Sequence, residues 1–211
     1  MQQNSAKSFL EENYLAWYPE AGVGYYPVKE LPYDVEYFNK YVEYSKTELG
    51  KALSETRRDL VDGTYLGSLL DVGIGCGDFI KTRGGSTYGY DINPVSVDWL
   101  IEKSLFLNPY YSKVYAASFW DALEHIHDID KILKNVKQYV FCSIPIFKNL
   151  EHLLASKHYR KDEHCWYFTH EGLKFFMKKC GFEMIHCDDR ESKLGREDIL
   201  SYIFSRCDYN V

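Results

Sequence analysis

Residues 69–80 read Leu-Leu-Asp-Val-Gly-Ile-Gly-Cys-Gly-Asp-Phe-Ile, and this stretch decides the fold of the chain. Two apolar residues and an acid are typical of a short buried strand, and three alternating glycines are typical of a tight turn. Glycine permits positive φ and leaves no Cβ between the backbone and a ligand. A helix beginning near Phe79 would then present free N–H groups and its positive dipole end. The stretch predicts a ligand-binding turn after the first strand of an open α/β sheet, with a plain β-turn as the alternative.

The hydrophobic pattern around this stretch predicts strands that alternate with helices. We expect strands at residues 68–72, 87–91, 114–119, 139–147, 182–187 and 199–205. We expect helices at 34–60 with a division at Gly50, after Asn93, after Asp128, and from Thr169 to Gly181. Residues 1–32 suggest a short helix and an irregular aromatic segment, and residues 148–168 an irregular, His-rich segment. This order predicts an α/β fold with a mostly parallel sheet, an antiparallel edge strand and helices on both faces.

A chain of 211 residues is long enough for one compact domain with a buried core. We divide it into an N-terminal helical and aromatic cap segment, residues 1–66, and a ligand-binding domain, residues 67–211. Many of the 19 Tyr precede residue 45. Tyrosine covers apolar surface while keeping a polar tip, which suits a lid, although a half-buried Tyr-rich helix is the alternative. The candidates for a lid are Trp17, Tyr18, Tyr25 and Tyr26.

Charge and cysteine usage limit the partners that we expect. The net charge of −6 provides no overall basic field to attract nucleic acid. The six Cys form no Cys-x-x-Cys pair, so reduced thiols in a cytoplasmic protein explain them best. The first residues lack the apolar core of a signal peptide, and no stretch reaches the length of a membrane span. A small molecule is therefore the expected partner, and the sequence does not indicate the oligomeric state.

Asp91 follows the second predicted strand, one helix after the Gly-rich turn. In a nucleoside-binding α/β fold, an acid at this place accepts hydrogen bonds from both ribose hydroxyls. A solvated acid is the alternative, but the spacing from the turn favours nucleoside binding. A nicotinamide-dependent enzyme is disfavoured, because the sixth position of the Gly-x-Gly-x-x-Gly fingerprint holds Asp78.

Three motifs together resemble those of class I S-adenosylmethionine (SAM)-dependent methyltransferases. They are Asp-Val-Gly-Ile-Gly-Cys-Gly at 71–77, Tyr-Gly-Tyr-Asp-Ile-Asn-Pro at 88–94 and Phe-Trp-Asp-Ala-Leu-Glu-His-Ile at 119–126. The Leu-Glu-His form resembles the subgroup of small-molecule methyltransferases, as do residues 168–173 and 180–182. The resemblance spans residues 69–204 and implies a Rossmann-like fold. Because the interval from Asp91 to Ser118 is short for the family, the usual third strand is expected to be abbreviated or missing.

The resemblance also implies which residues bind SAM. The Gly-rich turn and its acid would surround the methionine half, Asp91 would hold the ribose, and Ile92 would lie beside the adenine. The end of the third predicted strand would face the transferred methyl group. The complete set of expected cofactor-binding residues is Asp71, Gly73, Gly75, Gly77, Asp91, Ile92, Asn93, Ser118, Phe119 and Trp120.

Methyl transfer to a hydroxyl or amine calls for a base, and the candidates are Asp121, Glu124, His125 and His164. Two neighbouring strand ends face one crevice, so we expect the two histidines to approach an acceptor from two sides. For His125, a helix-start histidine bonded to backbone is the alternative. No metal is expected, because the His and Cys spacings from His152 to His170 match no zinc template.

The sequence thus predicts a SAM-dependent methyltransferase that acts on an oxygen or nitrogen of a small-molecule or nucleotide-like acceptor. Two alternatives remain: a nucleic-acid or protein methyltransferase, and a non-catalytic SAM-binding regulatory protein. Asn-Pro-Tyr-Tyr at 108–111 resembles a motif of nucleic-acid amino-methylating enzymes. It lacks that motif's second Pro and precedes the strand that should carry it, which disfavours the nucleic-acid reading.

Overall fold

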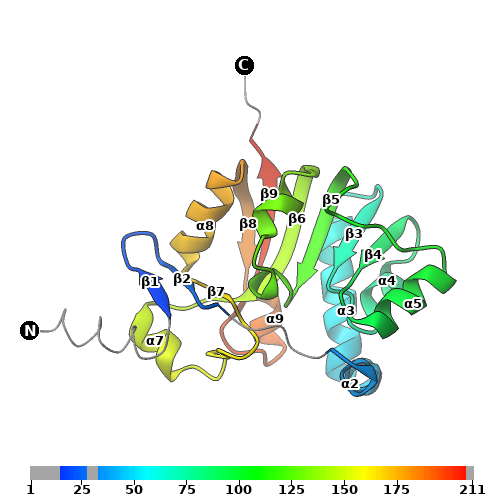
Figure 1. Cartoon of the computed structure of the whole chain (residues 1–211), viewed down its shortest axis with the longest axis horizontal. Helices are drawn as coiled ribbons and strands as arrows, with labels where there is room; N and C mark the ends of the chain where they lie inside the picture. Colours follow the sequence, from blue (N-terminus) through cyan, green and yellow to red (C-terminus); the bar gives the residue numbers. More distant parts are fainter. Residues whose placement is uncertain (1–14, 28–32, 208–211) are drawn as a thin grey trace, which may run out of the picture.

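The structure, a computed structural model, describes residues 15–27 and 33–207 of the chain (Figure 1). A six-stranded sheet has the order β4-β3-β5-β6-β9-β8, and a three-stranded sheet has the order β1-β2-β7. The strands are β1 (Ala16–Tyr18), β2 (Val23–Tyr25), β3 (Leu69–Val72), β4 (Thr87–Tyr90), β5 (Val114–Trp120), β6 (Val136–Pro145), β7 (Trp166–Phe168), β8 (Phe182–Asp188) and β9 (Ile199–Arg206). The helices are α2 (Val35–Lys46), α3 (Glu48–Asp62), α4 (Asp78–Arg83), α5 (Pro94–Glu102), the 3₁₀ turn η1 (Leu123–His125), α6 (Ile129–Leu133), α7 (Leu150–Ala155), α8 (His170–Lys179) and α9 (Arg190–Lys193).

The large sheet confirms the predicted α/β fold, with one difference in strand order. β3, β4, β5 and β6 are parallel, and β9 is antiparallel to both of its neighbours, β6 and β8. The antiparallel strand therefore lies one place inside the sheet, and β8 forms the edge. The short connection between β8 and β9 requires them to be antiparallel neighbours. It does not determine which of the two lies next to β6, so the sequence pattern could not place β9.

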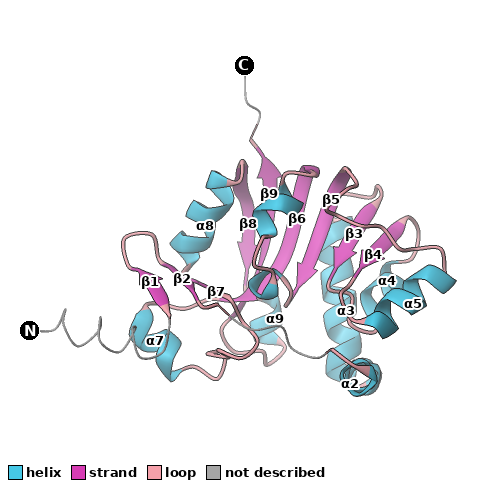
Figure 2. Cartoon of the chain, in the orientation of Figure 1, coloured by secondary structure: helices cyan, strands magenta, loops and turns pink. Residues whose placement is uncertain are grey.

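Helices cover both faces of the large sheet, as Figure 2 shows. Adjacent residues of one strand point to opposite faces. Leu70 and Ala117 pack in a cluster with α6 and α8, whereas Leu69 and Ala116 pack in a cluster with α3 and Phe79 of α4. Each strand is thus apolar on both sides, which explains its continuous hydrophobic run. Within the described ranges, no helix is both long and apolar enough to cross a membrane.

The expected third strand is reduced to a single bridge. After α5 the chain returns to the outer edge of β4, where Phe106 forms an isolated parallel bridge with Gly89. The backbone N–H of Gly89 donates to Leu105 O, and the N–H of Leu107 donates to Gly89 O. The interval between Asp91 and Ser118 is short, and only this bridge stands in place of the third strand. The sequence analysis expected that strand to be abbreviated or missing.

The long N-terminal helix predicted at 34–60 is divided at Thr47 and not at Gly50. Thr47 has extended backbone angles, and its side chain accepts a hydrogen bond from the N–H of Gly50, which caps α3. Gly50 lies inside α3, and its backbone passes close to Tyr44. A Cβ at position 50 would lie 2.3 Å from the carbonyl oxygen of Tyr44, so this position requires a glycine. The capping threonine, not the glycine, ends α2.

Two segments predicted as irregular are ordered. The aromatic segment at the start of the chain forms the β1–β2 hairpin, which pairs with β7 through Val23 and Phe168. Residues 148–168, predicted as irregular, contain α7 and β7. A bridge between Ile146 and Phe168 joins the small sheet to the large one. Such short strands depend on partners distant in sequence, which local patterns do not reveal. The short helix predicted at the start of the chain lies outside the described residues.

Candidate functional site

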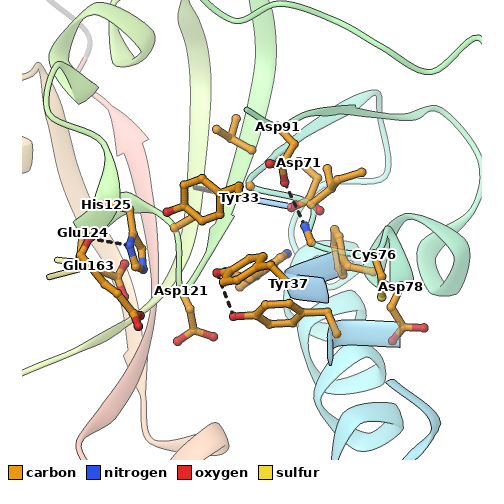
Figure 3. Close-up of a pocket in the computed structure, with 18 of the residues that line it drawn as sticks. Tyr33, Tyr37, Asp71, Cys76, Asp78, Asp91, Asp121, Glu124, His125 and Glu163 are labelled. Atoms are coloured by element: carbon orange, nitrogen blue, oxygen red, sulfur yellow. Dashed lines mark hydrogen bonds between the residues drawn. The ribbon is translucent and has the colours of Figure 1, made fainter. Parts of the chain in front are cut away.

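A cavity of about 1090 Å³ opens where β3, β4 and β5 end. Its walls come from the turn after β3, the loop after β4, the η1 region, α2, α3 and the segment before β7. Figure 3 shows Asp91 and Asp71 on one side, Glu124 and His125 on the opposite side, and tyrosine rings between them. The cavity thus has one end at the predicted nucleoside site and the other at the predicted base residues.

The Gly-rich turn adopts the conformation that its sequence predicts. Gly73 and Gly75 have φ of 80° and 55°, in the left-handed region that side chains disfavour. An added Cβ at Gly73 would lie 2.7 Å from the Cβ of Ala122, so the turn packs directly against the loop after β5. At Gly75 the added Cβ would face the ring of Tyr41 at 3.6 Å across the cavity. Gly73 therefore allows the turn to pack against Ala122, and Gly75 leaves no side chain between the turn and Tyr41 on the cavity wall.

Asp91 is placed to accept hydrogen bonds in the cavity. Its Oδ2 accepts the N–H of Gly75 at 3.1 Å, and its Oδ1 accepts the N–H of Asn93 at 2.8 Å. Each oxygen keeps a lone pair for a further donor. Burial raises the pKa of Asp91, and backbone N–H groups oppose that rise. Ile92 also lines the cavity and is 62% exposed, which leaves its side chain available to a flat apolar ligand group.

Asp71 lies at the end of β3 and is buried at the floor of the cavity. Its Oδ1 accepts a hydrogen bond of 2.7 Å from Ser118 Oγ. Burial raises the pKa of Asp71 to about 7, against the opposing effects of Ser118 and Arg57. This carboxyl therefore changes its charge near neutral pH.

Four residues expected to bind the cofactor do not line the cavity: Gly77, Asn93, Ser118 and Phe119. Asn93 is buried and caps α5 by accepting the N–H of Val95 at 3.0 Å. Ser118 and Phe119 are fully buried within β5, and Ser118 reaches the site only through Asp71. Of the three β5 residues in the predicted set, only Trp120, the last residue of the strand, lines the cavity.

Tyr33, which precedes α2, and two tyrosines of α2 form a wall that the sequence analysis did not single out. Tyr33, Tyr37 and Tyr41 line the cavity, and the hydroxyls of Tyr37 and Tyr41 lie 3.3 Å apart. Their spacing of four residues places them on one face of a helix, a signal that was available in the sequence. The proposed lid residues Trp17, Tyr18, Tyr25 and Tyr26 do not line this cavity.

Glu124, His125 and His164 lie together at the opposite end. The rings of His125 and His164 are nearly perpendicular, at 88°, with centroids 4.6 Å apart. Glu124 and His164 are buried, with 1% and 4% of their surface exposed. Several hydrogen bonds hold the two segments together. Among them are Cys165 N–H to Glu124 O, the indole N–H of Trp166 to Ile126 O, and His125 Nδ1 to Glu163 O at 2.8 Å. This confirms the expected meeting of the two histidines at one crevice.

The environment keeps this cluster uncharged near neutral pH. Burial, with a smaller effect of the nearby Asp121 charge, raises the pKa of Glu124 to about 8. Burial and the neighbouring His125 lower the pKa of His164 to about 2, and burial also lowers the pKa of His125. Both imidazoles are thus neutral near pH 7, and each presents a lone pair on one ring nitrogen.

Asp121 is paired with two arginines, which argues against the role of base that the sequence analysis suggested. Arg57 Nη2 donates to its Oδ2 and Arg196 Nη2 to its Oδ1, each at 2.9 Å. Burial opposes the negative charge, but the two guanidinium groups outweigh burial and hold the pKa of Asp121 well below its usual range. A carboxylate so paired has no tendency to take a proton near neutral pH. We assign Asp121 to positioning the loop after β5.

This arrangement of sheet and cavity has counterparts among known methyltransferases. Residues 38–187 match a family model described as a methyltransferase domain. No curated protein matches. A solved structure similar to this chain is the magnesium protoporphyrin IX methyltransferase of Synechocystis PCC 6803 with bound S-adenosylhomocysteine (SAH), at 14% identity and a TM-score of 0.57, covering 82% of this chain and 95% of that one.

Two further solved structures resemble this chain over similar lengths. A possible histamine N-methyltransferase from Thermotoga maritima shares 16% identity, with a TM-score of 0.57 and coverage of 81% of this chain and 97% of that one. A putative methyltransferase in complex with the Trm112 activator from Haloferax volcanii shares 11% identity, with a TM-score of 0.59 and coverage of 82% and 98%. At these identities the likeness concerns the fold.

Proposed function

The chain belongs to the methyltransferase domain family, and from that premise we propose that it methylates an oxygen or nitrogen atom of a small-molecule or nucleotide-like acceptor. The family uses SAM, and the chain is a SAM-dependent methyltransferase. The observation that carries the acceptor proposal is the cavity, which joins a nucleoside site to a cluster of proton-accepting side chains.

The residues at the first end of the cavity fit SAM. Gly73, Gly75 and Asp91 line this end of the cavity, and the carboxylate of Asp91 is aligned there by the N–H groups of Gly75 and Asn93. Tyr37 and Tyr41 supply aromatic faces, which favour a nearby positive charge. When bound, SAM supplies an electrophilic methyl group on a positively charged sulfur.

The size of the cavity supports a small acceptor. Sites for one small molecule usually occupy about 300–1,000 Å³, and this cavity of about 1090 Å³ has room for SAM and a second small ligand. The structural neighbours named for a porphyrin and for histamine differ in acceptor, so the fold alone does not choose it. The residues at the end of the cavity that holds Glu124, His125 and His164 must select the acceptor.

The chain's contribution to the chemistry is alignment, exclusion of water and control of a proton. The tyrosines of α2 cover the cavity between its two ends, which limits water at the reacting atoms. The carbonyl of Glu163 fixes the ring of His125 through Nδ1. Glu124, His125 and His164 line the second end of the cavity, where they contact the acceptor's polar group. Where no other base acts, a neutral imidazole takes the acceptor's proton.

The nucleoside site is tested with Asp91→Ala. Hydrogen bonds to a carboxylate contribute about 1.5–3 kcal/mol each, so we expect SAH to bind roughly 10- to 100-fold more weakly in calorimetric titration. The control is Asp98→Ala, an exposed acid on α5 that does not line the cavity. An Asp91→Ala variant that folds and binds SAH within twofold of the parent would show that Asp91 does not hold the nucleoside.

The acceptor class is tested by measuring SAH release from SAM with a panel of small hydroxyl and amine compounds. We expect turnover with a member of that panel, and turnover to fall by about 10²–10⁴-fold in His164→Ala while SAH affinity stays constant. Turnover only with RNA or a protein substrate would contradict the small acceptor. SAM binding with no methyl release to any of these substrates would support the non-catalytic alternative.

A further inference from the structure

The three side chains at the acceptor end have the composition of a metal site. Glu124 offers a carboxylate oxygen, and His125 and His164 each offer a ring nitrogen, with all three atoms within 4.8 Å of one another. They come from two segments that backbone hydrogen bonds hold together, so their proximity is fixed by the fold.

The carboxylate of Glu124 lacks a partner. Its Oε2 is buried and has no hydrogen bond within the described part of the chain. A buried polar atom left in this way costs about 1–3 kcal/mol, and native structures rarely leave one without a function. A cation bound between Glu124 and the two histidines would satisfy this oxygen.

His125 is oriented as a metal ligand. A carbonyl oxygen can only accept, so the contact between His125 Nδ1 and Glu163 O places the hydrogen on Nδ1. The other nitrogen, Nε2, therefore carries the lone pair. Histidines that bind metals usually donate their second N–H to a carbonyl or carboxylate, which fixes the ring and its tautomer.

We infer that Glu124, His125 and His164 bind one divalent transition-metal ion, and that this ion holds the oxygen of the methyl acceptor; the second half of the inference rests on the proposed function. Two imidazoles and one carboxylate suit first-row ions such as Zn²⁺, Fe²⁺ or Mn²⁺, whereas Mg²⁺ and Ca²⁺ prefer oxygen ligands. Metal–ligand bonds of about 2.0–2.2 Å place ligand atoms about 3–3.5 Å apart, so binding draws the three side chains together by about 1 Å.

Three protein ligands leave coordination positions open toward the cavity, as in catalytic sites. A hydroxyl bound there loses its proton to solvent more readily, because the cation stabilises the resulting anion. That oxygen forms the new bond to the methyl carbon, and the sulfur of SAM keeps the electron pair of the bond that breaks. Without a metal, the same reaction would need an imidazole to take the proton.

The binding test uses the full chain treated with a chelator and then titrated with Zn²⁺ and with Co²⁺ as a spectroscopic probe. We expect one ion per chain, with an affinity at least about tenfold lower in Glu124→Gln and in His164→Gln. The matched control is His158→Gln, because this cavity-lining histidine is already bonded through Nε2 to Glu197 O at 3.0 Å. We expect this control to bind the ion as the parent does, and Mg²⁺ to bind weakly to every variant.

The Co²⁺ spectrum separates this site from the free cysteines of the chain. We expect bands of a nitrogen- and oxygen-ligated ion, without thiolate charge transfer. Absence of Zn²⁺ and Co²⁺ binding, thiolate bands, or an equal loss in His158→Gln would overturn the inference. SAH titration of every variant reports both folding and the cofactor site. A chain that binds SAH but no metal refutes only this inference. One that binds the metal but neither SAH nor SAM refutes the proposed function and the acceptor-binding half of the inference, and leaves the metal site standing.

Discussion

Asp71 illustrates how one buried residue makes the molecule sensitive to pH. Its pKa is raised by burial to about 7 in the folded chain, against about 3.9 when unfolded. The folded state thus holds this proton more tightly, so its contribution to stability is complete below about pH 4 and is lost as pH rises through about 7. In Asp71→Asn this dependence disappears, while Ser118 keeps an oxygen to which it can donate.

We therefore expect the difference in unfolding free energy between Asp71→Asn and the parent to grow by about 2–3 kcal/mol in favour of the variant from pH 5 to pH 8. Urea denaturation without SAM at the two pH values measures it. The exposed Asp98 on α5 provides the control, since Asp98→Asn should keep the pH dependence of the parent. A constant difference for Asp71→Asn would mean that Asp71 titrates alike in both states.

At the residue scale, the sequence indicated the parts of the site that depend on local spacing. The Gly-rich turn at 73–75 and Asp91 were predictable because turn glycines and strand-end acids have local signatures. The meeting of His125 with His164 was predictable from strand order. The cluster's resemblance to a metal site was not, because two adjacent ligands and a third one strand later match no template. The pairing of Asp121 with Arg196 was likewise invisible, since it joins residues far apart in the sequence.

Helix α2 is the element of the site with the weakest attachment. None of its residues is buried, so little apolar packing opposes its local opening. Tyr37 and Tyr41 nevertheless face the cavity, and Asn93 Nδ2 donates to Asp34 O at the helix start. A ligand beneath the tyrosine rings would add contacts that α2 lacks.

We expect saturating SAH to slow hydrogen exchange of the α2 amides, residues 35–46, by about tenfold or more. Helix α8 is the internal control, because it has a buried face and no residue on the cavity wall. Its exchange should change little. Equal exchange of α2 with and without SAH would show that the helix is not a cover for the cofactor.

At the element scale, the strands and helices with a clear hydrophobic period were predicted well, for example β3 and α8. The β1–β2 hairpin and β7 were missed because three-residue strands acquire their stability from one another. The break at Thr47 was misplaced because Gly50 was treated as a helix breaker, although close packing of its backbone requires a glycine inside α3.

Across the whole molecule, one buried ion network connects segments that are distant in sequence. Glu191 of α9 is fully buried and accepts hydrogen bonds from Arg57 of α3 at 2.7 Å and from Ser143 of β6 at 2.5 Å. Arg196 bonds to Glu191 and also to Asp121 after β5. Two guanidinium groups are thus balanced by two carboxylates, and Arg57, Arg196 and Asp121 themselves line the cavity.

Removing one charge from this network should destabilise the entire domain, because it leaves two partly buried cations facing a single acid. We expect Glu191→Gln to lower the free energy of unfolding by about 3–5 kcal/mol, measured by urea denaturation as one cooperative transition. Glu171→Gln is the control, since it breaks an exposed pair with Lys174 on α8 and should leave the midpoint nearly unchanged. Equal midpoints for the two variants would show that the network contributes no more than a surface pair. A loss confined to Glu191→Gln would instead show that contacts between α9, α3 and the loop bearing Asp121 stabilise the whole domain.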